Sequence, residues 1–315
     1  MYGGPLPSQR ANSRRFAGAA AAVGWLLALS GCAAALPSAT ASGGETPTTP
    51  AATTSPAAAP TASGVTGGAI SGTFDANGHS LFITCVGSGS PTIVIEAGEG
   101  QLSDEMSQIT PALAERGRVC SYDRANLGQS GPAPNPRSAR DIVDDLHALL
   151  GAAAVPGPYL LIGHSGGGPY VQLYPRVYPT EVAGVLITNP VPPCAEWMEK
   201  GFLEMSAAEQ ADERAYLAGE NPETVDWCES SEQISALPAP TMPVEVLIST
   251  IAQCASTSDI CGRTYPAYTE IMRDLAESWP AGRFSQVESP HSIYARKPDA
   301  FLAVVDALLD RIASQ

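Results

Sequence analysis

Ser165 stands between two glycines in the stretch Gly163-His164-Ser165-Gly166-Gly167, directly after an apolar run from Tyr159 to Ile162. The run is typical of a buried parallel strand, and the apolar spacing after the motif is typical of a helix. A sharp turn from strand to helix would lift the serine hydroxyl into solvent, and glycines are needed there because larger side chains would collide with neighbouring backbone. Free amides at the start of the helix favour a developing oxyanion. We therefore predict that Ser165 is a nucleophile; the alternative is a glycine-rich turn without chemistry.

A serine hydroxyl becomes a good nucleophile only when a base takes its proton. The chain has four histidines. His79 falls in a predicted hairpin, His147 lies on a helix face, and His164 occupies a variable position of the motif, where its side chain points the wrong way to serve as base. His291 follows the last predicted strand and precedes the last predicted helix. A histidine at that location can reach back over the sheet, so we predict that His291 is the general base.

The segments that must position Ser165 and His291 alternate between strand and helix. Strands are predicted over residues 70–74, 80–86, 92–96, 118–122, 159–162, 182–188, 243–251 and 283–288, and helices over 103–116, 137–150, 266–279 and 298–312. This alternation predicts an α/β fold with a mainly parallel sheet and helices on both faces. Ligands bind beyond the carboxyl ends of such strands, where Ser165, residues 97–100, the loop after Ile251 and His291 would meet.

The alternation breaks between residues 190 and about 241. This segment contains Pro192 and Pro193, short helical patterns and two cysteines, so we predict an inserted lid. Its large apolar side chains either line an acyl pocket or pack within the lid; they are Trp197, Met198, Phe202 and Met205.

Three motifs together resemble the α/β-hydrolase family, over residues 69–315. They are the Ser165 motif, the turn Tyr122-Asp123-Arg124-Ala125-Asn126-Leu127-Gly128-Gln129-Ser130, and Pro290-His291. In that family the second motif supports the site, which implies a structural Asp123. Asn126 and Leu127 depart from the small residues of the family pattern.

The resemblance implies an oxyanion hole and a triad acid. The oxyanion donors would be the backbone amide of Gly166 and, after the Gly98 turn, that of Glu99, with the Gly100 amide as the next choice. The chain order Ser, acid, His implies Asp259, the one carboxylate between Ile251 and the next predicted helix. Some relatives place the acid after the strand that precedes the lid, but Asn189 stands there and carries no charge.

The implied activity is two-step acyl transfer on a carboxylic ester, of the carboxylesterase or lipase kind, with a small-molecule or lipid ester as substrate. No cofactor is required, and no spacing of cysteines and histidines indicates a metal site. An amidase or peptidase with the same triad is one alternative. A non-catalytic, surface-anchored binding lipoprotein on this scaffold is the other, because fold alone does not establish function.

The net charge of −15 argues against binding to nucleic acid or to an anionic membrane by electrostatics. Residues 1–32 nevertheless predict an export signal, with basic residues at 10, 14 and 15 and an apolar stretch from Phe16 to Leu29. Leu29-Ser30-Gly31-Cys32 resembles a bacterial lipobox, which would make Cys32 a lipidated anchor. Residues 33–68, rich in Ala, Pro, Thr and Ser, are predicted to be a disordered tether. We thus expect an exported lipoprotein held at the extracytoplasmic face of the cell membrane.

Six further cysteines in an exported chain predict disulfides. We favour Cys85–Cys120, which would join two strand-like runs, and Cys254–Cys261, which would pin one loop. Cys194–Cys228 would then staple the lid.

Overall fold

The computed structural model describes residues 68–251 and 259–315. The predicted signal peptide, Cys32, nearly all of the predicted tether, and Cys254 lie outside these ranges.

One eight-stranded sheet organises the described chain, in the order β1-β2-β4-β3-β5-β6-β7-β8. β1 and β2 form the predicted hairpin, β2 pairs antiparallel with β4, and the other neighbours are parallel. This confirms the predicted α/β architecture with a mainly parallel sheet. The strands are β1 (Ile70–Ala76), β2 (His79–Val86), β3 (Thr92–Glu96), β4 (Val119–Tyr122), β5 (Tyr159–His164), β6 (Val182–Thr188), β7 (Val244–Ser249) and β8 (Gly282–Val287).

Burial explains the two kinds of strand pattern. Every residue of the central strands β3 and β5 is buried, because helices cover both faces of the sheet there. The edge strand β1 alternates between more and less exposed residues, as expected where one face meets solvent.

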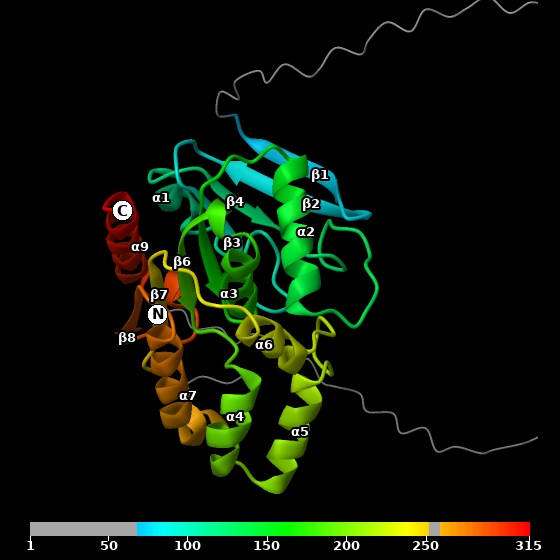
Figure 1. The fold of residues 1–315 in the computed structure, drawn as a ribbon, viewed down its shortest axis with the longest axis vertical. Coiled ribbons are helices and arrows are strands. Elements are labelled where there is room, and N and C mark those ends of the chain that lie inside the picture. Colours follow the sequence, from blue (N-terminus) through cyan, green and yellow to red (C-terminus); the bar gives the residue numbers. More distant parts are fainter. Residues whose placement is uncertain (1–67, 252–258) are drawn as a thin grey trace, which may run out of the picture. The chain divides into compact units, whose positions relative to one another are not determined.

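Helices lie on both faces of the sheet, as Figure 1 shows. One apolar core joins the sheet to α2 (Ala139–Ala152), α3 (Gly167–Val177) and α7 (Ile260–Glu277). A second core, on the opposite face, joins it to α1 (Thr110–Ala114), α8 (Ile293–Arg296) and α9 (Pro298–Ala313). The 3-10 turn η1 (Pro179–Glu181) links α3 to β6.

The predicted lid is a group of short helices between β6 and β7. It comprises α4 (Cys194–Lys200), η2 (Gly201–Glu204), α5 (Ala207–Leu217) and α6 (Trp227–Ser235). Within the described unit, α4 and α5 lie far from the β1–β2 hairpin (Figure 1). Trp197 packs on Gly201 and donates a hydrogen bond to Glu213, 2.8 Å away. Phe202 and Met205 are also buried, so these side chains pack within the lid, while Met198 is about one-third exposed.

Two helix boundaries differ from the prediction. The helix expected over 103–116 is reduced to α1, and residues 103–109 form turns. Asp123 accepts the Ser103 amide at 2.7 Å and Glu105 turns inward, while Pro111, which has no amide, sits in the first turn of α1. Conversely, α7 begins at Ile260 and carries Pro266 inside it, six residues earlier than predicted.

The described chain contains two of the predicted disulfides. Cys85 and Cys120 face each other across β2 and β4, and Cys194–Cys228 joins α4 to α6. Cys261 is also disulfide-bonded. Within the described ranges, no helix is both long and apolar enough to cross a membrane.

We predict that the double variant Cys85→Ala/Cys120→Ala unfolds with a free energy lower by about 2–4 kcal/mol, because this cross-link constrains the unfolded chain. Urea unfolding in oxidising buffer measures the difference. Adding dithiothreitol should lower the stability of the natural sequence and narrow the gap. Equal stabilities of the two proteins in oxidising buffer would contradict the assigned pair.

Candidate active site

Ser165 lies at a sharp turn between β5 and α3. Its φ of 52° is in the left-handed region, which a residue with a side chain adopts only under constraint from its surroundings. The Ser165 amide donates to the Thr188 carbonyl at 3.0 Å, and the Ser165 carbonyl accepts the Gly168 amide at 2.9 Å. These bonds fix the turn that the sequence motif predicts.

The glycines around Ser165 are required by close packing. A Cβ atom on Gly163 would lie 2.5 Å from a Val171 methyl group, and one on Gly167 would lie 2.3 Å from the Glu96 carbonyl oxygen. Both distances are far below van der Waals contact. Strand, turn and helix can therefore approach this closely only because Cβ atoms are absent.

Gly166 and Glu99 bring the two predicted oxyanion donors together. A Cβ atom on Gly166 would lie 3.0 Å from the Glu99 amide nitrogen and 2.9 Å from the Glu99 Cβ. Within the described part of the chain neither amide donates a hydrogen bond to another residue. Two backbone N–H groups close together beside a serine can hold an oxyanion.

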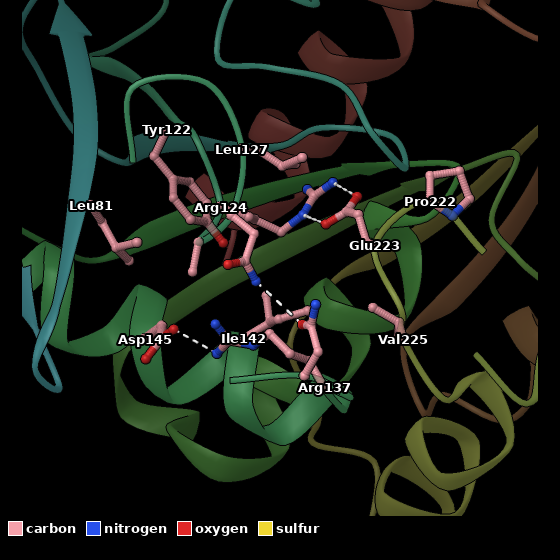
Figure 2. Close-up of a pocket in the computed structure, with 13 residues that line it drawn as sticks. Leu81, Tyr122, Arg124, Leu127, Arg137, Ile142, Asp145, Pro222, Glu223 and Val225 are labelled. Atoms are coloured by element: carbon pink, nitrogen blue, oxygen red, sulfur yellow. Dashed lines mark hydrogen bonds and ion pairs between the residues drawn. The ribbon is translucent and has the colours of Figure 1, made fainter. Parts of the chain in front are cut away.

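Charged side chains from separate segments hold loop 97–100 (Ala97-Gly98-Glu99-Gly100). Arg124 donates to the carbonyls of Ala97 and Gly98 at 2.8 and 2.7 Å, and Glu105 accepts the Gly98 amide at 2.8 Å. Glu223, from the lid, accepts the Gly100 amide at 2.6 Å and also pairs with Arg124 (Figure 2). The backbone that carries the Glu99 amide is thus fixed on both sides.

Arg124 lies at the centre of a buried group of charges and is only 3 % exposed. It pairs with Glu96 at 3.2 Å and with Glu223 at 2.6 Å, and Tyr122 donates a hydrogen bond to Glu96. Burial raises the pKa of Glu96 to about 7, although Arg124 and Tyr122 oppose the rise. Of the two carboxylates, Glu223 makes the shorter contact with Arg124.

A small cavity lies beside this group, lined by Tyr122, Arg124 and Glu223 together with the ion pair Arg137–Asp145 (Figure 2). Its volume of about 50 Å³ suits water, because substrate pockets hold roughly 300 Å³ or more. The cavity therefore belongs to the support of the site.

His291 lies close to the sharp turn that carries Ser165. Its ring centroid is 4.8 Å from that of His164, the residue before Ser165, and the Asn189 side chain donates to the His291 carbonyl at 2.5 Å. Burial, and secondarily His164, lowers the pKa of His291 to about 4, so its imidazole is neutral at physiological pH. A neutral imidazole is the form that can accept a proton.

Asp259, the predicted acid, directly precedes α7. Its carboxylate is 83 % exposed and accepts a hydrogen bond from Arg263 at 3.1 Å. Residues 252–258, which connect it to β7, lie outside the described ranges. Its role as the triad acid stays a prediction.

Several residues that support the site were not predicted from the sequence. Arg124 lies inside a motif that was recognised, but its own contacts carry no local signal. Asn189 was considered only as a possible acid; the structure shows that its amide group bridges the His291 carbonyl and the Ser249 amide. Glu105 and Glu223 had no pattern that could have singled them out. Asp123 accepts the amides of Ser103 and Gln129, a structural role.

The described residues contain no group of three or more His, Cys, Asp or Glu side chains placed to hold a metal ion.

We predict that Gly166→Ala lowers kcat about 10²-fold, because the new methyl group must push Glu99 and its amide away from Gly166. Steady-state kinetics on a nitrophenyl ester measures the loss. Gly151→Ala is the matched control: apart from its own helix and chain neighbours, nothing lies within 4 Å of the added Cβ, and the exposed helical site should gain up to about 1 kcal/mol of stability. A Gly166→Ala enzyme with an unchanged kcat would show that the contact between Gly166 and Glu99 is not part of the oxyanion site.

Comparison with known proteins agrees with the observed fold. A family model described as alpha/beta hydrolase fold matches residues 91–235. The uncharacterized protein YqjL of Bacillus subtilis is 34 % identical over 104 residues, which cover 33 % of this chain and 41 % of YqjL. This chain spans less than half the length of the curated relatives it matches.

Two solved structures illustrate the shared fold. An enol-lactonase from Burkholderia xenovorans has a TM-score of 0.55 at 17 % identity, covering 76 % of this chain and 99 % of the lactonase. A putative lipase from Acinetobacter baumannii has a TM-score of 0.58 at 14 % identity, covering 79 % and 93 %. The protein therefore has the α/β-hydrolase fold.

Proposed function

We propose that this protein is a serine hydrolase that cleaves carboxylic esters through an acyl-enzyme on Ser165. The observation that carries the proposal is the left-handed Ser165 beside the close contact of Gly166 with the Glu99 amide. In this arrangement the proposed nucleophile lies beside two proposed oxyanion donors, as acyl transfer requires.

In the first step, His291 takes the proton of the Ser165 hydroxyl while the serine oxygen attacks the ester carbonyl. The negative charge that forms on the carbonyl oxygen is held by the amides of Glu99 and Gly166. His291 then gives its proton to the leaving alcohol, and the acyl group stays on Ser165.

In the second step, His291 removes a proton from water, which attacks the acyl-enzyme. Collapse of the second tetrahedral intermediate releases the carboxylic acid and returns the proton to Ser165. We retain Asp259 as the proposed triad acid. No step requires a cofactor.

An ester substrate is supported by the names of the two similar structures, a lactonase and a putative lipase. The burial of Trp197, Phe202 and Met205 within the lid leaves Met198 as the exposed member of that apolar set. We therefore propose a small-molecule or lipid ester as the substrate class.

We further propose that the protein is exported and anchored to the membrane through Cys32. The disulfides Cys85–Cys120 and Cys194–Cys228 support this location, since such bonds persist in oxidising compartments.

Fluorophosphonate labelling of the mature protein tests the proposed activity. We expect covalent labelling and turnover of nitrophenyl esters, with both lost in Ser165→Ala because the nucleophilic oxygen is absent. Anilide substrates assayed in parallel separate an esterase from an amidase. A folded protein that is not labelled would contradict the proposal and favour a binding protein on this scaffold.

A further inference from the structure

Glu105 joins three segments of the candidate site through one buried carboxylate. One oxygen accepts the Gly98 amide at 2.8 Å, within loop 97–100. The other lies 2.7 Å from His164 Nδ1 and accepts the Tyr294 hydroxyl at 3.2 Å. The side chain is 6 % exposed. The segments that carry an oxyanion donor, the nucleophile and the base therefore meet at this one group.

His164 stands between Glu105 and His291. The Glu105 carboxylate accepts a hydrogen from Nδ1, so Nε2 is the ring nitrogen of His164 that this bond does not use. That atom is buried and has no hydrogen-bond partner among the described residues. The ring lies 4.8 Å from the His291 ring, at an interplanar angle of 51°. His164 thus lies between the two groups, with a short contact to Glu105 on one side and a ring contact with His291 on the other.

We propose that Glu105, acting through His164, is a positioning residue for the base His291. The inference rests on the proposed function, since it requires His291 to accept the Ser165 proton. When that proton moves from the serine oxygen to His291, Glu105 keeps its negative charge and stabilises the imidazolium. No proton passes along the Glu105–His164 bond.

The charges around His291 agree with this role. Burial and His164 lower the pKa of His291, whereas the charge of Glu105 raises it. Contact with His164 and the Gly98 amide outweighs burial and lowers the pKa of Glu105 itself, so its carboxylate is ionised at neutral pH. Tyr294 donates to this carboxylate, and burial raises the pKa of its phenol to about 12, so Tyr294 stays neutral. Glu105 is consequently the negative charge in this cluster.

Asp259 differs from Glu105 in its surroundings. Its exposed carboxylate faces Arg263 and is screened by solvent. Glu105 is buried, and an interaction over a few ångströms is much stronger in that setting. The two carboxylates can therefore be separated by experiment.

Glu105→Gln tests the proposal, because it keeps the shape of the side chain and removes its charge. We expect kcat to fall about 10²-fold with little change in KM. The acid limb of kcat/KM should also move to lower pH: activity is lost when His291 is protonated, and removing a charge that raises its pKa lowers that pKa further. The rate of fluorophosphonate inactivation against pH reports the same limb.

Glu245→Gln is the matched control, since Glu245 is a buried carboxylate on β7 bonded to Ser285 and Arg311. It should lower Tm without moving the acid limb. A Glu105→Gln enzyme with a lowered Tm but an unchanged acid limb and kcat would overturn the proposal and leave Glu105 a purely structural role. Asp259→Asn, measured alongside, gives the separate contribution of the predicted acid.

A double-mutant cycle measures the coupling between Glu105 and His164, which a general loss of stability in one variant would not produce. If Glu105 acts through His164, the effect of Glu105→Gln on kcat should be much smaller in a His164→Asn background. Independent, multiplicative effects would count against transmission through His164. Absence of fluorophosphonate labelling in the natural sequence would instead refute the proposed function, so the two failures are distinguishable.

Discussion

The left-handed backbone of Ser165 is the constraint on which the surrounding packing depends. A non-glycine residue in this region costs about 1–3 kcal/mol and persists only where its neighbours enforce it. The Thr188 carbonyl of β6 accepts the Ser165 amide, which holds the turn from one side. On the other side, the absence of Cβ atoms lets α3 approach β5 at Gly163 and the end of β3 at Gly167. The turn also contacts the lid, because the Val191 amide donates to the Ser165 carbonyl at 3.3 Å.

Charge, rather than apolar packing, fixes the loop opposite Ser165. Arg124 pairs with carboxylates from β3 and from the lid, and it donates two hydrogen bonds to the carbonyls of Ala97 and Gly98. Desolvating such charges is costly, so a buried ion pair is weak grounds for stability. Its consequence here is geometric: the guanidinium fixes the direction of carbonyls in the loop that carries the Glu99 amide. Apolar side chains could fill the same space without orienting that backbone.

Local signals in the sequence were sufficient to predict the sheet, the sharp turn around Ser165, and the position of His291 between the last strand and the last helix. They depend on periodicity and on glycine at fixed spacing, which operate over a few residues. Glu105 could not be found this way, since its spacing fits a helix face and its true environment depends on Gly98, His164 and Tyr294. Arg124 and Glu223 meet across 99 residues, and no periodic pattern records such a pairing. The early start of α7 was missed because Pro266 usually marks the first turn of a helix.

The lid belongs to the candidate site through the same charges. Tyr216 donates to the Glu99 carboxylate at 2.7 Å, and Glu223 bonds both Arg124 and the Gly100 amide. Displacing these lid residues would leave Glu96 as the one carboxylate paired with Arg124 among the described residues. The Glu223 charge raises the pKa of Glu96, so its removal would favour ionisation of Glu96. Loop 97–100 would then lose two contacts that restrain Glu99 and Gly100. Because the proposed oxyanion donors require a fixed backbone, these lid contacts would contribute to their geometry.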